Sequence, residues 1–322
     1  MKELKDLLPP NIYEVIGQAG TLTVRQIIIL SVWDIKKSTN LCFDDILLLK
    51  NIVTNYLCPT SSTGNNLKNN YNNIPTLSTG CDDLDNLLNG GLRRGTITEV
   101  FGESGCGKTQ LALQTTLKNW ASGSVYICTE DLFPTKRFEE MKQYVFKCCP
   151  KNDYGNNVFV EHITEVNDLL SCLRVRLPNL LAHNKLSLIV IDSVAAPFRC
   201  ESTNYIKRAE DLREMAISLT KVAQEYNLAI LCINQVTTSF EESLNVLPSL
   251  GLAWSNMVTT RLMIKKTVRI ADAKHLEKND SKLLTCKHNT FIRELHIVFA
   301  PHLPQRIINF VITSSGVWCI PD

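Results

Sequence analysis

Hydrophobic positions return every three or four residues along the first 57 residues, which is the spacing of one face of an α-helix. Thr23 followed by Gln26 forms a capping box in front of an apolar run that begins at Ile27. A second pattern of this kind includes Ile46 and Val53. Residues 1–57 therefore predict a small, all-helical N-terminal domain in which the apolar stripes form a core.

The pattern stops at residues 58–75, where the composition becomes polar. Six asparagines occur within the nine residues 65–73, and serine, threonine and glycine flank them. Such a composition is typical of a flexible connection between domains. We therefore expect an Asn-rich, flexible linker over 58–75.

Short β-rich runs alternate with helical patterns over residues 76–322, as in a mostly parallel sheet with crossover helices. The run 188–191 is apolar at every position, which is typical of a central strand covered on both faces. The second domain is therefore predicted to be of the α/β class. Its expected strands are 97–101, 124–128, 158–163, 186–191, 228–233, 258–264, 294–299 and 307–312, with an edge strand over 317–319.

Composition and charge narrow the class of protein. Hydrophobic residues make up 44% of the 322 residues, which excludes a mostly disordered chain. Lys and Arg number 34 against 32 Asp and Glu, a net charge of +2, so any contact with nucleic acid must be local. The longest apolar runs fall far short of the ~18 residues that cross a bilayer, so we expect a soluble protein.

Twelve cysteines raise the alternatives of disulfides and of a metal site. None of them forms Cys-x-x-Cys, and the pair Cys286 and His288 lacks a second half, which disfavours zinc. Others, such as Cys128 and Cys232, lie within apolar runs, where a free thiol behaves as a small hydrophobe. A reducing, intracellular compartment is the simplest expectation.

The most specific motif spans residues 102–109 and matches G-x-x-x-x-G-K-[ST] in full. An apolar strand precedes it and a helical pattern follows, so loop N–H groups and the positive end of the helix can surround phosphate oxygens. The lysine would reach the β- and γ-phosphates, and the threonine hydroxyl would join a Mg²⁺ shell. The residues expected to bind nucleotide are Gly102, Glu103, Ser104, Gly105, Cys106, Gly107, Lys108 and Thr109.

Polar residues at other strand ends help to decide between the classes of phosphate-loop protein. Asp192 ends an apolar strand and is the expected Mg²⁺-side carboxylate, while Glu130 follows another strand and can polarise water. Parallel strands would bring both to one sheet edge, and two solvated strand-end acids are the plainer alternative. Asn234 and Gln235 end a further strand, where an amide can sense a γ-phosphate. The guanine-specific sequence Asn-Lys-x-Asp is missing, which disfavours a GTPase.

The segments Thr129-Glu130-Asp131, Val190-Ile191-Asp192-Ser193 and Ile233-Asn234-Gln235-Val236, placed around this phosphate loop, resemble the RecA-type recombinase family. Leu77-Ser-Thr-Gly80 and the helical domain in front are similar to its eukaryotic branch, which includes the paralogues of the strand-exchange recombinase. The resemblance covers residues 76–322. It implies a RecA-like P-loop ATPase core that binds ATP and Mg²⁺.

The resemblance also implies a role for each site residue. Glu130 matches the position that activates water and Gln235 the sensor of the γ-phosphate, so with Lys108 they form the expected catalytic set. Thr109 and Asp192 match the metal ligands. The other matches are Arg137, at the position of an arginine that packs against adenine, and Arg199, Lys207 and Arg208, in the first DNA-facing loop.

Two departures from the family pattern shape the expected partners. The second DNA-facing loop, 237–250, carries Glu241 and Glu242 and no Lys or Arg, which is unfavourable beside a phosphate backbone. Residues 54–78 contain no Phe, whereas a self-polymerising recombinase would carry a Phe-x-x-Ala hook there. We therefore expect a heterodimer or small hetero-oligomer with another recombinase paralogue, weak binding of single-stranded or branched DNA by the chain alone, and no membrane contact.

The resemblance implies a nuclear protein, with room for a cytoplasmic pool, that mediates homologous-recombination repair of DNA double-strand breaks. It would load or stabilise filaments of the strand-exchange recombinase, handle recombination intermediates and hydrolyse ATP slowly in a DNA-dependent way. Two alternatives stay open. One is a strand-exchange recombinase that polymerises by itself, and the other is a scaffold that binds ATP without turnover.

Two further expectations concern single segments. Residues 265–288 hold seven Lys or Arg against three Asp or Glu, and form either a solvated hairpin tip or a contact for DNA or a partner. Cys106 lies inside the phosphate loop, so alkylation of its thiol is expected to block nucleotide binding.

Overall fold

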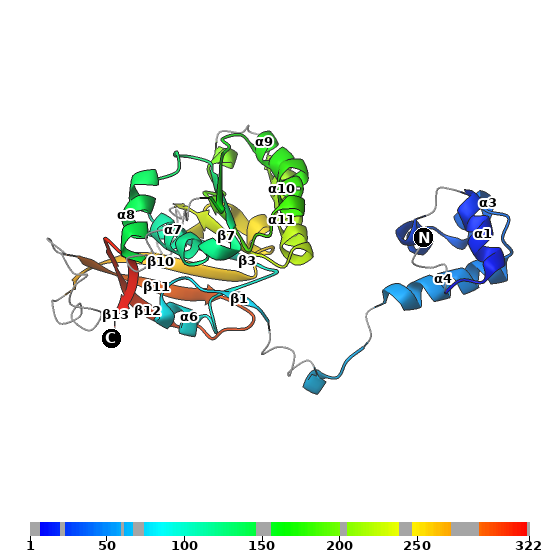
Figure 1. The fold of residues 1–322 in the computed structure, drawn as a ribbon, viewed down its shortest axis with the longest axis horizontal. Helices are drawn as coiled ribbons and strands as arrows, with labels where there is room; N and C mark the ends of the chain where they lie inside the picture. The colour runs from blue at the N-terminus through cyan, green and yellow to red at the C-terminus, as the bar shows by residue number, and fades with distance from the viewer. Residues whose placement is uncertain are drawn as a thin grey trace. The chain divides into compact units, whose positions relative to one another are not determined.

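The chain divides into two compact units, Met1–Asn73 and Ile74–Asp322, and each is described by itself (Figure 1). The sequence places the domain boundaries at 57 and 75, and much of the predicted linker, 59–60 and 67–73, lies outside the described residues. The structure is a computed structural model. It describes residues 7–19, 23–58, 61–66, 74–145, 156–199, 205–237, 247–271 and 290–320.

The first unit is built from helices. Thr23 caps the second of them as predicted: its hydroxyl accepts from the N–H of Gln26, and its own N–H donates to the Gln26 side chain. The buried side chains of Ile12, Ile27 and Ile46 meet in one core. The predicted helical N-terminal region is confirmed. Its helices are α1 (Pro10–Ala19), α2 (Val24–Ile29), α3 (Val32–Ser38) and α4 (Phe43–Leu57).

A nine-stranded sheet organises the second unit. Five of its eight strand pairings are parallel, which confirms the predicted mostly parallel sheet, and three antiparallel strands extend one edge. In spatial order the strands are β13 (Gly316–Ile320), β12 (Ile307–Thr313), β11 (Phe291–Phe299), β10 (Thr260–Ile270), β3 (Ile97–Gly102), β7 (Ala229–Asn234), β6 (Leu188–Asp192), β4 (Ser124–Cys128) and β5 (Val158–His162).

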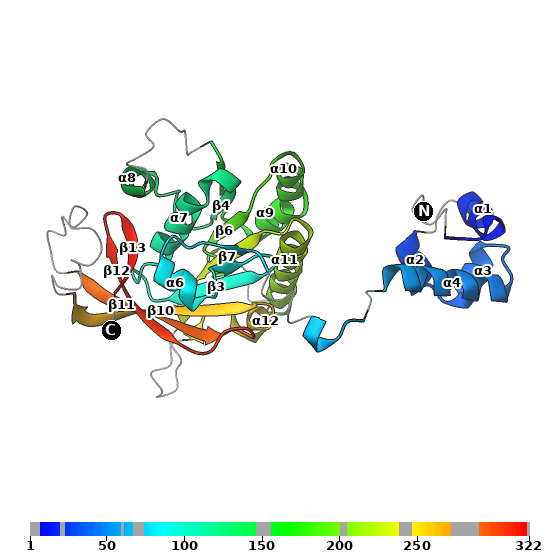
Figure 2. The same ribbon diagram turned by 60° about the horizontal axis from the view of Figure 1, so that its bottom comes forward.

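Helices cover both faces of the parallel part of the sheet. Figure 2 shows α7 (Lys108–Lys118) and α8 (Thr135–Val145) on one side, and α9 (Val166–Ser171), α10 (Leu177–His183) and α11 (Tyr205–Glu225) on the other. Since successive strand side chains point to opposite faces, each central strand contributes to two cores. The other elements are α6 (Asp82–Leu87), α12 (Gly251–Ser255), the pair β1 (Thr76–Leu77) and β2 (Leu92–Arg93), and the pair β8 (Val236–Thr237) and β9 (Leu247–Pro248).

The predicted strands differ most from the observed ones at the antiparallel edge. β10 continues to Ile270, beyond the predicted end at 264, because β11 pairs with it from Phe291 onward. Lys265, Lys266 and Arg269 therefore belong to a strand, which corrects the expectation of a hairpin tip for this part of the basic segment. Residues 272–288 of that segment lie outside the described residues. Within the described part of the chain, no helix is both long and apolar enough to span a bilayer.

Candidate nucleotide-binding site

The phosphate loop joins the end of β3 to the start of α7. Two of its glycines are required by close packing. A Cβ on Gly102 would stand 2.2 Å from the carbonyl oxygen of Ile264 in the neighbouring strand. Gly107 has φ +109°, and a Cβ there would stand 2.3 Å from Cδ1 of Ile312. Glycine is therefore required at both positions, and the tight turn that it allows is typical of loops that bind phosphate through their N–H groups.

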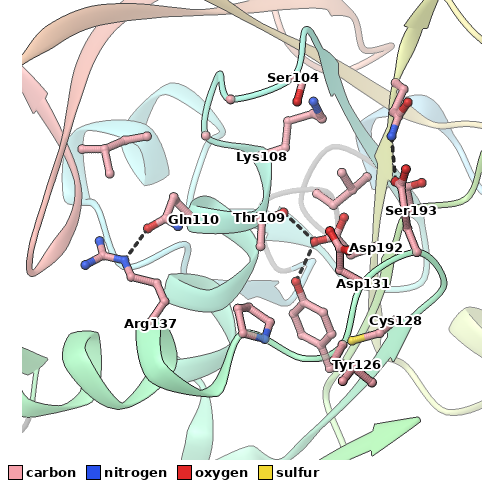
Figure 3. A pocket seen from close by; sticks show the side chains of 18 of the residues that line it. Ser104, Lys108, Thr109, Gln110, Tyr126, Cys128, Asp131, Arg137, Asp192 and Ser193 are labelled. Carbon is pink, nitrogen blue, oxygen red and sulfur yellow. Dashed lines mark hydrogen bonds between the residues drawn. The ribbon is translucent and has the colours of Figure 1, made fainter. Parts of the chain in front are cut away.

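Lys108 and Thr109 begin α7 and face the cleft (Figure 3). The Lys108 Nζ donates to the carbonyl oxygens of Gly102 at 2.7 Å and Glu103 at 2.8 Å, which holds the ammonium group at the loop. The Thr109 hydroxyl donates to Asp192 Oδ2 at 2.7 Å. The structure thus brings the predicted phosphate lysine and the two predicted metal ligands together.

Asp192 lies at the end of β6, two strands away from β3 in the sheet. Burial raises the pKa of its carboxyl, while hydrogen bonds from Thr109 and from Tyr126 favour the ionised form and oppose that rise. The Tyr126 hydroxyl, on β4, donates to the same Oδ2 at 2.9 Å. Sequence reasoning gave Tyr126 no role in the site, although it lies on β4, the strand that Glu130 follows and the neighbour of β6 in the sheet. Both hydrogen bonds are accepted by Oδ2, and together they fix the orientation of the Asp192 carboxylate.

Glu130 and Gln235 also meet, from the ends of β4 and β7. Gln235 Nε2 donates to Glu130 Oε2 at 2.8 Å, and Arg199 Nη1 donates to Oε1 at 3.1 Å. Arg199 is predicted from the resemblance to face DNA, and here its side chain reaches the predicted water-activating carboxylate. Lys207 and Arg208 lie in the first turn of α11 rather than in a loop, and their contact with DNA stays a prediction.

A buried polar cluster lies beneath Gln235, and the sequence pattern gave no sign of it. Glu99 on β3 is fully buried and accepts from Arg261 at 2.5 Å, Asn234 at 2.6 Å and Trp254 at 2.8 Å. Asn234 Oδ1 in turn accepts from the Gln235 N–H at 2.7 Å and from the Ser249 hydroxyl at 2.8 Å. The cluster therefore fixes Gln235 relative to the phosphate-loop strand.

The same cluster reaches the second predicted DNA-facing loop. The N–H of Ser249 donates to the carbonyl oxygen of Gln235 at 3.0 Å. β8 and β9 pair just outside this contact, at Val236 with Pro248. The two ends of the loop are thus hydrogen-bonded to each other next to Gln235. Glu241 and Glu242 themselves lie outside the described residues.

The cleft that is lined by Lys108, Thr109, Tyr126, Glu130, Asp192 and Gln235 has a volume of about 680 Å³, which falls in the usual range for a small-molecule site. Arg137 on α8 lies at its rim and is held by Gln110 at 2.6 Å and by the carbonyl oxygens of Thr313 at 2.6 Å and Ser314 at 2.9 Å (Figure 3). These contacts fix the guanidinium group against the turn between β12 and β13. Its packing against adenine stays a prediction.

The expectation for Cys106 needs correction. Its side chain is fully buried, and burial raises the pKa of the thiol, which lowers its reactivity. Rapid alkylation at this position is therefore not expected. The sequence shows that Cys106 belongs to the phosphate loop but not which way its side chain points. In the structure the side chain points into the core that α7 and β3 share.

The cleft fits ATP and Mg²⁺ by the chemistry of its donors. Oxygen ligands from a hydroxyl and a carboxylate suit Mg²⁺, which takes its remaining ligands from phosphate and water. The described residues hold no group of three or more His, Cys, Asp or Glu side chains that could surround a metal by themselves. Lys108 would supply the positive charge toward the phosphates, and the glycine turn would leave space for them.

Comparison with known proteins identifies relatives along nearly the whole chain. The DNA repair protein XRCC3 of Bos taurus is 34% identical over 343 positions, which cover 98% of this chain and 96% of that protein. XRCC3 of Mus musculus is 34% identical over 274 positions, or 76% and 75% of the two chains. The DNA repair protein rhp57 of Schizosaccharomyces pombe is 24% identical over 353 positions, or 94% of each chain.

The similarity to XRCC3 agrees with the segments in which the sequence most resembles one recombinase paralogue, the third X-ray repair cross-complementing protein, namely 126–131, 192–201, 231–236 and 300–304. The sequence profile described as Rad51 matches residues 70–319, which is most of the chain and contains every cleft residue named above. The chain therefore belongs to the Rad51 family of RecA-type recombinases.

Proposed function

We propose that the chain is an ATP-binding mediator of recombination repair of DNA double-strand breaks. The observation that carries the proposal is the convergence of Lys108, Thr109, Asp192, Glu130 and Gln235 on one cleft from the ends of four strands. Two relatives named DNA repair protein XRCC3 support the repair role. Bound Mg²⁺ and ATP would supply the phosphoryl chemistry.

The residues of the chain have distinct tasks in this proposal. Lys108 balances the charge of the phosphates, and Thr109 and Asp192 hold the metal-side oxygens. Glu130 accepts a proton from the attacking water. Both of its carboxylate oxygens already accept hydrogen bonds, from Gln235 and Arg199. The attacking water must compete with these two donors for the carboxylate. This competition supports slow hydrolysis, which DNA binding can accelerate.

A mediator role agrees with the departures from the family pattern in the sequence. The acidic residues at 241 and 242 disfavour an independent hold on a phosphate backbone. The absence of Phe from residues 54–78 disfavours self-polymerisation. We infer a nuclear protein that works in a hetero-oligomer with another Rad51 paralogue and stabilises filaments of the strand-exchange recombinase.

The proposal is tested by ATP binding and turnover with and without single-stranded DNA. Lys108→Ala should lose ATP binding, and Glu130→Gln should keep binding but lose turnover. Lys118→Ala, at the exposed end of the same helix, is the matched control and should change neither. A wild-type chain that fails to bind ATP contradicts the proposal.

The alternatives give different results in the same preparations. Long filaments of the chain alone, seen by sedimentation with ATP and single-stranded DNA, would favour a self-polymerising recombinase. Bound ATP with no turnover, unchanged by Glu130→Gln, would favour a scaffold. The mediator proposal expects filament stabilisation only when the strand-exchange recombinase is added.

A further inference from the structure

Arg293 is a half-buried cation in the cleft and lacks a carboxylate partner among the described residues. It lies on β11, and its Nη1 donates to the carbonyl oxygen of Phe291 at 3.0 Å. Its Nε is buried and has no hydrogen-bond partner within the part of the chain that the structure describes. Arg137, the other arginine that lines the cleft, is paired with Glu140 at 2.6 Å. Among the described residues, the charge of Arg293 is therefore uncompensated.

Two neighbouring groups that could balance this charge, Glu294 and Cys106, are engaged or neutral. Glu294, the next residue on β11, bonds to Arg269 and to His296. Cys106 stays a neutral thiol because burial raises its pKa. Burial also lowers the pKa of Arg293, which reflects the cost of removing a guanidinium group from water without a counter-charge.

The position of Arg293 follows from the length of β10. That strand pairs with β3 as far as Ile264 opposite Gly102, and then runs past the phosphate loop to Ile270. β11 lies beside this extension, with Arg293 opposite Lys266. The Arg293 side chain consequently packs along the loop, where a Cβ on Gly107 would stand 3.8 Å from its Cδ.

We propose that Arg293 is a second cationic ligand for the phosphates of the nucleotide, on the opposite side of the phosphate loop from Asp192. The inference rests on the proposed ATP binding and adds a residue to it. A guanidinium group offers several N–H donors in one plane and can grip two phosphate oxygens, whereas Lys108 acts as a point charge. Phosphate oxygens would supply the counter-charge that the described residues do not provide for this guanidinium group.

The test is calorimetric titration of the full chain with ATP, ADP and AMP in the presence of Mg²⁺. Arg293→Gln should weaken the binding of ATP and of ADP at least about tenfold, or about 1.4 kcal/mol. The binding of AMP should weaken less, because AMP carries fewer phosphates. Arg293→Lys keeps the charge but loses the planar donor pair, and should lose about threefold. Arg306→Gln removes an exposed arginine just before β12 and should change no affinity.

The outcomes separate this inference from the function on which it rests. A wild-type chain that does not bind ATP overturns both. A wild-type chain that binds ATP, with Arg293→Gln equal to it, overturns the inference alone. A third outcome is that Arg293→Gln weakens the binding of all three nucleotides equally and, without nucleotide, melts at a lower temperature than Arg306→Gln. This outcome would assign Arg293 a purely structural role and would also overturn the inference.

Discussion

Removing the charge of Glu99 tests whether the buried polar cluster beneath Gln235 stabilises the core. Glu99 is fully buried, and Arg261, its charged partner at 2.5 Å, is only 14% exposed. Glu99→Gln keeps the volume but puts an amide NH₂ group where an oxygen accepted a hydrogen bond. Breaking one side of a buried ion pair costs about 3–5 kcal/mol. We expect the lower end, about 3 kcal/mol, because one amide oxygen still accepts from a neighbour.

The matched control is Glu294→Gln on β11. Glu294 pairs with Arg269 at 2.8 Å, but the two side chains are 24% and 51% exposed. Ion pairs of this kind contribute about 0–1 kcal/mol. Urea unfolding followed by circular dichroism measures both variants. For a unit of this size, ~3 kcal/mol corresponds to a melting midpoint lower by roughly 6–12 °C.

A double-mutant cycle isolates the pair itself. Arg261→Met removes the cation while keeping an apolar stem, so its cost in the Glu99→Gln background should be smaller than in the wild type, with a coupling energy of about 1–2 kcal/mol. Strictly additive losses would refute the assignment of an ion pair. Equal losses for the two Glu→Gln variants would refute the dependence on burial.

Three further predictions follow from the cleft. Gly107→Ala should lower stability by about 1–3 kcal/mol and abolish ATP binding, because the position has φ +109° and no room for a Cβ; an unchanged melting midpoint would contradict this. Tyr126→Phe removes the donor to Asp192 and should weaken Mg²⁺-dependent ATP binding about tenfold. Equal ATP affinities of the variant and the wild type in a titration would contradict this. Iodoacetamide should label Cys106 at least about tenfold more slowly than the exposed Cys42, since burial hinders access to the thiol and raises its pKa. The labelling of Cys106 should accelerate as the pH rises. Comparable labelling rates of the two cysteines at pH 8, measured by mass spectrometry, would overturn the buried placement.

Local patterns predict the features that depend on neighbours in sequence. The apolar run before Asp192 marks a central strand, and the glycines before Lys108 mark a turn between strand and helix. Parallel pairing then brings strand ends together, so the meeting of Glu130 with Gln235 follows once the strands are placed. These parts of the fold and the cleft are readable because backbone geometry dictates them.

Partnerships between distant strands are not readable in this way. Glu99 looks like a polar interruption of β3, and only the fold shows that β7, β10 and α12 each present it with a donor. Arg293 sits in a strand with no motif around it, and it reaches the phosphate loop because β10 is longer than its apolar run. Side-chain contacts across a sheet depend on register, which the sequence patterns here leave open.

The strand order has a consequence for the synthesis of the protein. β3, which ends in the phosphate loop, has β7 and β10 as its neighbours, and both come far later in the chain. A nascent chain that ends before residue 260 lacks β10 and leaves β3 with at least one open edge. We therefore expect the phosphate loop to reach its final position only after most of the second unit has been synthesised. An open apolar strand edge favours aggregation, so we expect such incomplete chains to aggregate more readily than the full chain. Truncation before residue 260 should therefore disrupt the phosphate loop as well as remove the last strands.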